Sequence, residues 1–429
     1  MTGLLAIYAF DDIWRVGKYV YYGLLALQHR GQGAFQVYAL SNEGIAGGLF
    51  KEIRQEVFAE LNGWSMIAAA FPDYVDVRKC SYLLKGTDLE LAVLLDSSPG
   101  APPAEEVANV IYSKAVGGNL AKAVEEAVQL LHGVNDLLVM SSLGEVVAYR
   151  STPGLRPLVV GSYGFDMVIV ASEAPAVSIV GGEVRRSLSP GELIYITRYL
   201  VRSKRIKHCS RCSVCALELV YMARPDAIID GVEVYAFRRR LGEKLAEVFD
   251  KDVDVVIGVP ETAIPYAIGL AQALGKRFEL GFVSTGSRAR SALKADPLER
   301  LAAIQLKMNP VRGVFVGKKV AIVDDSLVTG ATAKTVIQIL RNRVGAKEVH
   351  LLLASPKIVR ECPHGLPLPS REELLAANLD DDLALKYVEA DSITWIPTDA
   401  LESTAEEHGI SLCLSCLEGV SAHEGPNSR

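Results

Sequence analysis

One stretch of the sequence, residues 318–337, constrains the fold more than any other. It contains an apolar run from Val320 to Val323, which is short enough for a fully buried strand. Two adjacent carboxylates, Asp324 and Asp325, follow, and then come a turn of small residues at 329–332 and a helical pattern. When a strand, an acidic pair, a turn and a helix follow one another in this order, the backbone N–H groups of the turn and of the helix N-terminus form a binding site for an anion. The stretch therefore predicts a phosphate site at the end of a buried strand.

An ordinary buried strand followed by a capped helix is the plainer interpretation, because Asp, Ser and Thr are common helix caps. Two successive acids at the end of a buried strand nevertheless need partners. The run from Val323 to Thr332 closely resembles the phosphoribosyl pyrophosphate (PRPP) motif of type I phosphoribosyltransferases, and most of all that of the amidophosphoribosyltransferases. The resemblance implies that Asp324 and Asp325 hold the ribose hydroxyls, in the region where magnesium binds. It implies PRPP contacts, chiefly with the 5-phosphate, for Ser326, Val328, Thr329, Gly330, Ala331 and Thr332.

Length and composition limit the number of domains and the kinds of partner that the chain can have. The chain has 429 residues, half of them apolar, which is enough for two or three domains with a sizeable core. The net charge of −6 gives no support for nucleic acid as a bulk partner. No uninterrupted apolar segment reaches the ~18 residues that a membrane helix needs. The first six residues lack the basic region of a signal peptide. These features predict a cytoplasmic protein with neither membrane nor nucleic acid as a partner.

The first domain is expected at residues 1–205, where strand and helix patterns alternate and predict two sheets with helices outside them. The expected strands include 3–10, 37–40, 66–70, 90–95, 136–142, 145–150, 158–161, 167–172 and 193–197, and the expected helices are 16–29, 104–116 and 120–131. Tyr21 to Gln32, with later landmarks at 151–158, 171–174 and 188–194, resembles the N-terminal-nucleophile glutaminase domain of amidophosphoribosyltransferases. The resemblance implies an N-terminal-nucleophile hydrolase-like domain with α/β/β/α layers.

The active site of that domain departs from the family. The family's nucleophile is a cysteine exposed as residue one after processing, and its counterpart here is Thr2. The family's glutamine-carboxylate and oxyanion segments appear as residues 68–73 and 93–96, and no arginine remains in the first. The family's Ser-Asp-Thr-Glu segment has no counterpart. We therefore expect the domain to have kept its fold and lost glutamine hydrolysis, and the loop His29–Gln32 to be structural.

A basic segment, Arg198 to Lys207, is expected to lead into a second domain at residues 206–416, with a disordered tail at 417–429. Strands and helices alternate in this domain, which predicts a doubly wound parallel sheet with ligands at the carboxyl ends of its strands. The expected strands are 253–259, 278–282, 319–324, 348–354 and 392–397, and the expected helices are 232–249, 263–274, 332–342 and 371–378. By resemblance, this is the type I phosphoribosyltransferase fold.

Two further segments of the second domain are expected to contact pyrophosphate. The family reads Pro-Asp-Ser-Gly after the first strand, whereas this chain has Pro260 and Glu261 followed by Thr-Ala. A plain strand-to-helix turn is an equal alternative at that position. The basic run 284–312 suggests a polyanion contact, although basic runs are usually solvated faces. By resemblance, Lys307 contacts pyrophosphate in a loop that closes over PRPP and excludes water.

The cysteines are not spread as a disulfide framework is, and in a cytosolic chain such clusters suggest metal first. In many amidophosphoribosyltransferases four cysteines hold a [4Fe–4S] cluster, and the matching positions here are Cys215, Cys362, Cys413 and Cys416. The rival interpretation is a zinc site that joins Cys209 and Cys212 to the last two of these. The third interpretation is that these thiols bind no metal. The cluster interpretation leaves Cys209 and Cys212 without a role.

The resemblance implies an enzyme in which ammonia displaces pyrophosphate from PRPP, with magnesium, to give 5-phosphoribosylamine in the first step of purine synthesis. The ammonia is expected to be free or to come from a partner glutaminase or an active paralogue. The chain is expected to form a homo-oligomer, either a dimer or a tetramer. The alternative is a non-catalytic subunit that binds PRPP or a nucleotide and regulates or scaffolds an active relative.

Overall fold

The computed structural model describes residues 2–115, 118–130, 133–284 and 308–418. Lys307 and most of the basic run before it lie outside the described residues. The chain divides into two compact units, each built from more than one segment. The first comprises residues 1–215, 226–231 and 363–366, and the second comprises 216–225, 232–362 and 367–429. The first unit therefore extends past the predicted boundary at residue 205 and takes in two short later segments.

Two antiparallel sheets form the framework of the first unit. Their strand orders are β11-β9-β10-β1-β4-β2-β3 and β13-β12-β8-β7-β6-β5. The larger sheet contains β1 (Gly3–Ala9), β2 (Ala34–Ser41), β3 (Gly44–Phe50), β4 (Ser65–Phe71), β9 (Val159–Tyr163), β10 (Met167–Ala171) and β11 (Glu183–Ser187). The smaller contains β5 (Ser81–Lys85), β6 (Glu90–Ser97), β7 (Val134–Ser141), β8 (Glu145–Arg150), β12 (Glu192–Thr197) and β13 (Leu200–Arg205).

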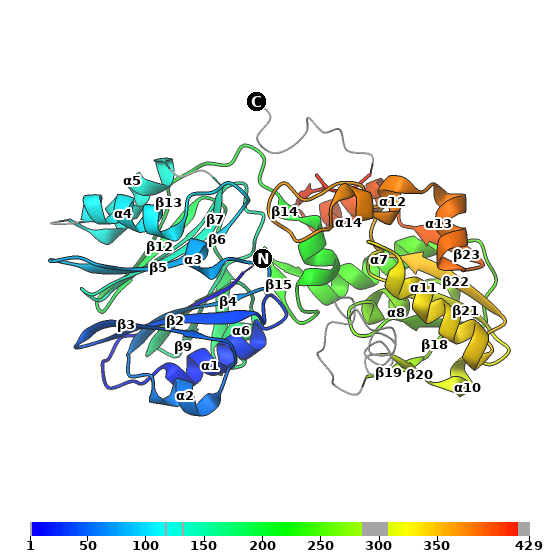
Figure 1. Cartoon of the computed structure of the whole chain (residues 1–429), viewed down its shortest axis with the longest axis horizontal. Coiled ribbons are helices and arrows are strands. Elements are labelled where there is room, and N and C mark those ends of the chain that lie inside the picture. Colours follow the sequence, from blue (N-terminus) through cyan, green and yellow to red (C-terminus); the bar gives the residue numbers. More distant parts are fainter. Residues whose placement is uncertain (1, 116–117, 131–132, 285–307, 419–429) are drawn as a thin grey trace. The chain divides into compact units, whose positions relative to one another are not determined.

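Helices cover the outer face of each sheet, so the predicted α/β/β/α layers are confirmed (Figure 1). Alternate residues of β1 pack into two different hydrophobic cores, one on each face of the sheet. Leu4, Ala6 and Tyr8 pack between the sheets, whereas Leu5 and Ile7 face the helices. The helices are α1 (Gly17–Ala26), α2 (Gln55–Glu60) and α6 (Pro175–Ser178) on the larger sheet, and α4 (Ala104–Ala115) and α5 (Leu120–Leu130) on the smaller; α3 (Val77–Cys80) leads into β5.

The segment predicted as a basic linker is in fact an edge strand. Residues Leu200–Arg205 form β13, which pairs in antiparallel register with β12, from Glu192↔Arg205 to Thr197↔Leu200. Every residue of β13 is exposed, so the strand has no apolar alternation that would reveal it in the sequence. Charged side chains on an edge also discourage pairing with other chains.

A parallel sheet organises the second unit. Its strands are β18 (Arg277–Phe278), β17 (Val255–Gly258), β21 (Lys319–Asp324), β22 (Glu348–Leu353) and β23 (Ser392–Trp395), in that spatial order. Each neighbouring pair is parallel. Numbered along the chain, the order is 2-1-3-4-5, so the predicted doubly wound sheet is confirmed. Its topological switch point lies between β17 and β21, where ligands bind in such folds.

Helices flank this sheet, and two of them touch backbone to backbone. A Cβ added to Gly242 of α7 would lie 2.0 Å from the carbonyl oxygen of Tyr266 in α8, so only glycine allows this approach. The helices are η1 (Glu218–Met222), α7 (Val234–Val248), α8 (Ile264–Leu274), α10 (Arg312–Phe315), α11 (Ala331–Ile339), η3 (Leu340–Val344), η4 (Arg371–Glu373), α12 (Leu375–Asn378), α13 (Asp381–Val388) and α14 (Thr398–Glu407). Short strands are β14 (Val214–Cys215), β15 (Ile228–Ile229), β16 (Val232–Glu233), β19 (Phe282–Val283), β20 (Asn309–Pro310) and β24 (Leu412–Cys413).

The predicted tail starts too early at residue 417. Leu417 is fully buried and forms an antiparallel bridge with Ile358. The Thr398 hydroxyl donates a hydrogen bond to the carbonyl oxygen of Glu418 over 2.9 Å. Both residues therefore belong to the second unit. Within the described ranges, no helix has the length and apolar character needed to cross a membrane.

Candidate functional site

The switch point places two loops of the second unit side by side. Gly258 and Val323 are partners in the parallel ladder of β17 and β21, and the N–H of Val259 donates to the carbonyl oxygen of Val323 over 2.9 Å. The loop that begins at Pro260 and the loop that begins at Asp324 therefore leave the sheet together. The sequence had singled out both loops separately.

The acidic pair lies at the end of β21, and both side chains are half-buried. The N–H of Asp325 donates to Asp324 Oδ1 over 2.9 Å, and the Ser326 hydroxyl donates to Asp325 Oδ1 over 2.7 Å. The side chain of Thr262, from the neighbouring loop, lies close enough to Asp325 to lower its pKa. The loop after β17 therefore lies beside Asp325, which follows β21.

The surroundings of the pair disfavour two negative charges. Burial, followed by repulsion from Asp325, raises the pKa of Asp324 to about 8. Burial also raises the pKa of Asp325, against the opposing effects of the Ser326 hydrogen bond and the charge of Arg238. The site is therefore short of positive charge or of hydrogen-bond donors. A ligand that brings hydroxyl groups or a cation supplies what these carboxylates lack.

Arg238 is a site residue that the sequence reasoning missed. It lies on α7, has no exposed surface, and donates to the carbonyl oxygens of Leu219 and Ala223, both over 2.8 Å. Its Nη1 has no hydrogen-bond partner among the described residues. The guanidinium is therefore held in place behind Asp325 as a fixed positive charge. The available signal was an arginine on the apolar face of the helix, between Val234 and Leu241.

The turn after the acidic pair has the geometry of an anion site. Gly330 has φ of +77° and precedes α11, whose first N–H groups have no acceptor within the helix. Thr329, Ala331 and Thr332 are exposed, so this helix end is accessible to a ligand. The N–H of Leu375 donates to the carbonyl oxygen of Val328 over 2.8 Å and anchors the turn. The macrodipole of α11 adds partial positive charge at the same place.

Replacing Gly330 by alanine is expected to destabilise the protein by about 2–4 kcal/mol, because the added Cβ combines a left-handed backbone with overpacking. That Cβ would meet Leu375 Cδ1 at 2.4 Å. Gly345→Ala is the matched control, because Gly345 also has positive φ, +89°, but has no heavy atom within 4 Å of the added Cβ. Urea unfolding of both variants measures the difference. Equal losses of stability would show that the contact with Leu375 does not matter.

The remaining predicted pyrophosphate contacts are only partly described. Glu261 is exposed, Pro260 is half-buried, and the peptide bond between them is cis. Lys307 lies outside the described residues. The next residue, Met308, is buried and lines a small cavity with Val259, Asp324 and Thr332, so this part of the chain reaches the acidic pair.

The first unit has a second polar centre, where the family's glutaminase nucleophile was expected. Thr2 is 3% exposed, and its backbone N–H donates to Asp96 Oδ1 over 3.1 Å. Arg156 pairs with the other oxygen of Asp96 over 3.2 Å. Asp136 lies opposite Asp96 on the neighbouring strand, and burial, followed by the charge of Asp96, raises its pKa well above the usual value. Thr2 is therefore nearly buried, and its backbone N–H is bound to a carboxylate that also pairs with Arg156.

The loop 29–32, predicted to be structural, makes contacts of a structural kind. His29 Nε2 and Arg30 Nε both contact Oε1 of Glu173 at 2.5 Å, and Glu173 is buried. The segment that corresponds to the family's glutamine-carboxylate site begins in the middle of β4, where Ala68, Ala69 and Ala70 have no exposed surface.

The cysteines proposed as cluster ligands occupy both units. Cys215 ends the main segment of the first unit and is buried. Cys362, Cys413 and Cys416 belong to the second unit, where only Cys416 is buried. Among the residues that the structure describes, no three His, Cys, Asp or Glu side chains are gathered closely enough to hold a metal ion.

Comparisons with known proteins agree with this geometry. A model of the phosphoribosyl transferase domain family matches residues 231–360. The amidophosphoribosyltransferase of Synechococcus elongatus is 30% identical and covers 97% of this chain and 90% of its own length. That of Bacillus subtilis is 28% identical, with coverage of 97% and 93%. A solved structure of the Bacillus subtilis glutamine PRPP amidotransferase, complexed with ADP and GMP, is 28% identical and superposes with a TM-score of 0.85 over 97% of this chain and 96% of that one.

Proposed function

Because the chain belongs to the amidophosphoribosyltransferase family, it is a phosphoribosyltransferase, and we propose that it transfers ammonia to PRPP, releasing pyrophosphate and giving 5-phosphoribosylamine. This is the first step of purine synthesis. The observation that carries the proposal is the pairing of Gly258 with Val323 at the switch point, where the N–H of Val259 also donates to the carbonyl oxygen of Val323 over 2.9 Å. This pairing supports a sugar-phosphate site that uses both the acidic pair and the loop after β17.

The described residues bind the two ends of the ribose. Asp324 and Asp325 accept hydrogen bonds from two ribose hydroxyls, which supply protons to a crowded acidic pair. The exposed turn at 329–332 and the N-terminus of α11 bind the 5-phosphate. With the sugar held at both ends, its C1 is presented to ammonia. The bond from C1 to the pyrophosphate oxygen breaks, a bond from C1 to nitrogen forms, and the nitrogen then loses one proton.

Magnesium is the cofactor that this donor set fits. Two adjacent carboxylates offer the oxygen ligands that magnesium prefers. A bound cation would favour the charged forms of these carboxylates, which burial disfavours. When bound with PRPP, magnesium neutralises charge on the departing pyrophosphate. Pro260, Glu261 and Lys307 are proposed to contact that pyrophosphate, and for Lys307 the support is the sequence resemblance alone.

The proposal is tested by pyrophosphate release from PRPP and magnesium with either ammonium or glutamine as the nitrogen source. We expect turnover with ammonium and turnover at least about tenfold lower with glutamine. No turnover with either nitrogen source, from protein that binds PRPP, would favour the non-catalytic regulatory subunit instead. Addition of an active glutaminase from a relative tests whether a partner supplies the ammonia.

We further propose that the first unit no longer hydrolyses glutamine. The support is that Thr2 is nearly buried, that a threonine replaces the family's cysteine, and that no arginine remains at residues 68–73. Purified protein is therefore expected to release no ammonia from glutamine. Ammonia release that disappears in Thr2→Ala, but persists in the control Thr87→Ala on an exposed turn, would contradict this proposal.

We propose that Cys215, Cys362, Cys413 and Cys416 bind a [4Fe–4S] cluster, because four thiolates suit iron–sulfur chemistry and their positions match the family's. Protein purified without oxygen is expected to be brown and to contain about four iron atoms per chain. Cys80→Ser is the control that should keep the iron, and Cys416→Ser should lose it. Colourless protein that carries one zinc per chain would support the rival zinc site. The homo-oligomer and the cytoplasmic location stay predictions.

A further inference from the structure

Cys209 and Cys212, which are not among the four proposed cluster ligands, lie in one loop of the first unit. We propose that they form a reversible dithiol–disulfide site that exchanges with small-molecule disulfides such as oxidised glutathione. The loop follows the edge strand β13 and returns to the body of the unit before β14. The proposal does not depend on the proposed reaction with PRPP, because it concerns another unit and another chemistry.

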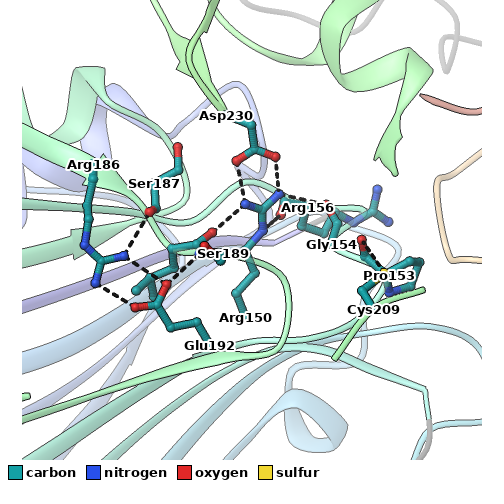
Figure 2. A network of polar contacts seen from close by, with 11 residues as sticks. Arg150, Pro153, Gly154, Arg156, Arg186, Ser187, Ser189, Glu192, Cys209 and Asp230 are labelled. Carbon is teal, nitrogen blue, oxygen red and sulfur yellow. Dashed lines mark hydrogen bonds and ion pairs between the residues drawn. The ribbon is translucent and has the colours of Figure 1, made fainter. Parts of the chain in front are cut away.

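Hydrogen bonds hold this loop against the segment around Pro153. The thiol of Cys209 donates to the carbonyl oxygen of Pro153 over 3.9 Å (Figure 2). The N–H of Ser213 donates to the same oxygen over 3.1 Å. The N–H of Cys215 donates to the carbonyl oxygen of Leu155 over 3.1 Å. Both ends of the short segment between Cys209 and Ser213 are therefore fixed. A fixed short loop keeps its two thiols close together.

The side chain of Cys212 also contacts Cys209. Its thiol donates to the carbonyl oxygen of Cys209 over 3.9 Å. The Cys212 side chain is also close enough to Cys209 to raise the pKa of its thiol. Closing a disulfide within a Cys-Xaa-Xaa-Cys loop therefore needs rotation of the side chains and little movement of the backbone.

The two cysteines differ in exposure, and each therefore has its own step in the exchange. Cys212 is exposed and Cys209 is half-buried, so Cys212 meets a disulfide reagent first. Burial, followed by the neighbouring Cys212 side chain, raises the pKa of Cys209 to about 12, against the opposing effects of the Arg211 backbone and the charge of Arg205. Once Cys212 is in a mixed disulfide, its own contribution disappears. Cys209 then becomes easier to deprotonate and completes the exchange.

The exchange balances as two thiol–disulfide steps. The Cys212 thiolate attacks one sulfur of the small-molecule disulfide, forming a mixed disulfide and releasing one thiolate. The Cys209 thiolate then attacks the Cys212 sulfur, closing the internal disulfide and releasing the second thiolate. The two protons of the protein thiols pass to the two released thiolates. One disulfide is reduced and one is formed, so no further oxidant is needed.

The test is peptide mapping of the full chain after equilibration with oxidised and reduced glutathione. Trypsin cleaves after Lys207 and Arg211, so the disulfide links the peptide His208–Arg211 to the peptide that begins at Cys212. We expect this linkage in most molecules under oxidised glutathione, its loss on addition of dithiothreitol, and its retention in the control Cys80→Ser. Fragmentation of the linked peptides shows whether Cys212 or Cys215 is the partner.

The variants separate the two steps. Cys209→Ser is expected to retain glutathione on Cys212, because the step that releases it is missing. Cys212→Ser is expected to form no linkage and to take up at least about fivefold less glutathione than Cys209→Ser. Equal glutathione uptake by the two variants would overturn the proposal. So would linkage of Cys209 to Cys215, an unlinked wild-type protein, or a stoichiometric zinc ion that must be removed before Cys209 reacts.

Discussion

Asp325→Asn is expected to lower ammonium-dependent pyrophosphate release about 100- to 1,000-fold, the usual effect of removing one preorganised electrostatic contact from an active site. The asparagine has the same shape but loses the negative charge that is proposed to hold a ribose hydroxyl. It also loses the oxygen that accepts from Ser326 if its amide nitrogen faces that hydroxyl. Asp88→Asn, an exposed aspartate on a turn of the first unit, is the matched control and should retain full activity.

The same variant separates catalysis from folding. Because the pKa of Asp325 is raised in the folded protein, the folded state binds its proton more tightly than the unfolded chain does. Its ionisation therefore destabilises the ligand-free fold as the pH rises above the unfolded pKa. We expect Asp325→Asn to be at least as stable as the wild type at pH 8. A variant that loses activity together with stability would contradict this account of the site.

Arg150→Leu is expected to destabilise the first unit by about 3–5 kcal/mol, the usual cost of breaking a buried ion pair from one side. Arg150 has no exposed surface and makes a two-bond ion pair with Asp230, with distances of 2.6 and 2.9 Å (Figure 2). It also donates to the carbonyl oxygens of Gly154, Arg156 and Leu188. The leucine leaves all of these acceptors without their donor. It also releases the segment 226–231 from the rest of the unit.

The matched control is Arg185→Leu, which removes an exposed ion pair with Glu183 at 2.9 Å. Exposed pairs of this kind contribute about 0–1 kcal/mol. Urea unfolding, followed through aromatic fluorescence, measures both variants. A loss below 1 kcal/mol for Arg150→Leu would mean that the network in Figure 2 adds little to stability.

The parts of the fold predicted best are those with a strong local signal. The strand at 319–324 was predicted with its observed bounds, because its buried apolar run stops at two acids. The first helix was predicted at 16–29 but spans only Gly17–Ala26. Its ends were misplaced because neither has a residue that caps the helix through its side chain. The strand β13 was missed because an exposed edge strand carries no apolar alternation. Helices α13 and α14 were missed although Asp380 caps the first of them through its side chain.

The residues of the candidate site also differ in whether a local sequence signal reveals them. The acidic pair and the turn at 329–332 follow one another in sequence, so a local motif reveals them. Arg238 and Thr262 come from other elements and join the site only through the tertiary fold. The pairing of Thr2 with Asp96 also bridges distant strands, so the sequence predicted the loss of a catalytic set but not the contact found at Thr2.

Titration calorimetry with PRPP and magnesium is the sharpest test of the proposal that the acidic pair and the turn after it bind PRPP. We expect one saturable site per chain in the wild type and binding at least about 100-fold weaker in the double variant Asp324→Asn, Asp325→Asn. Asp88→Asn should bind as the wild type does. A wild-type protein that gives no binding heat, or a double variant that binds PRPP as tightly as the wild type, would contradict the claim.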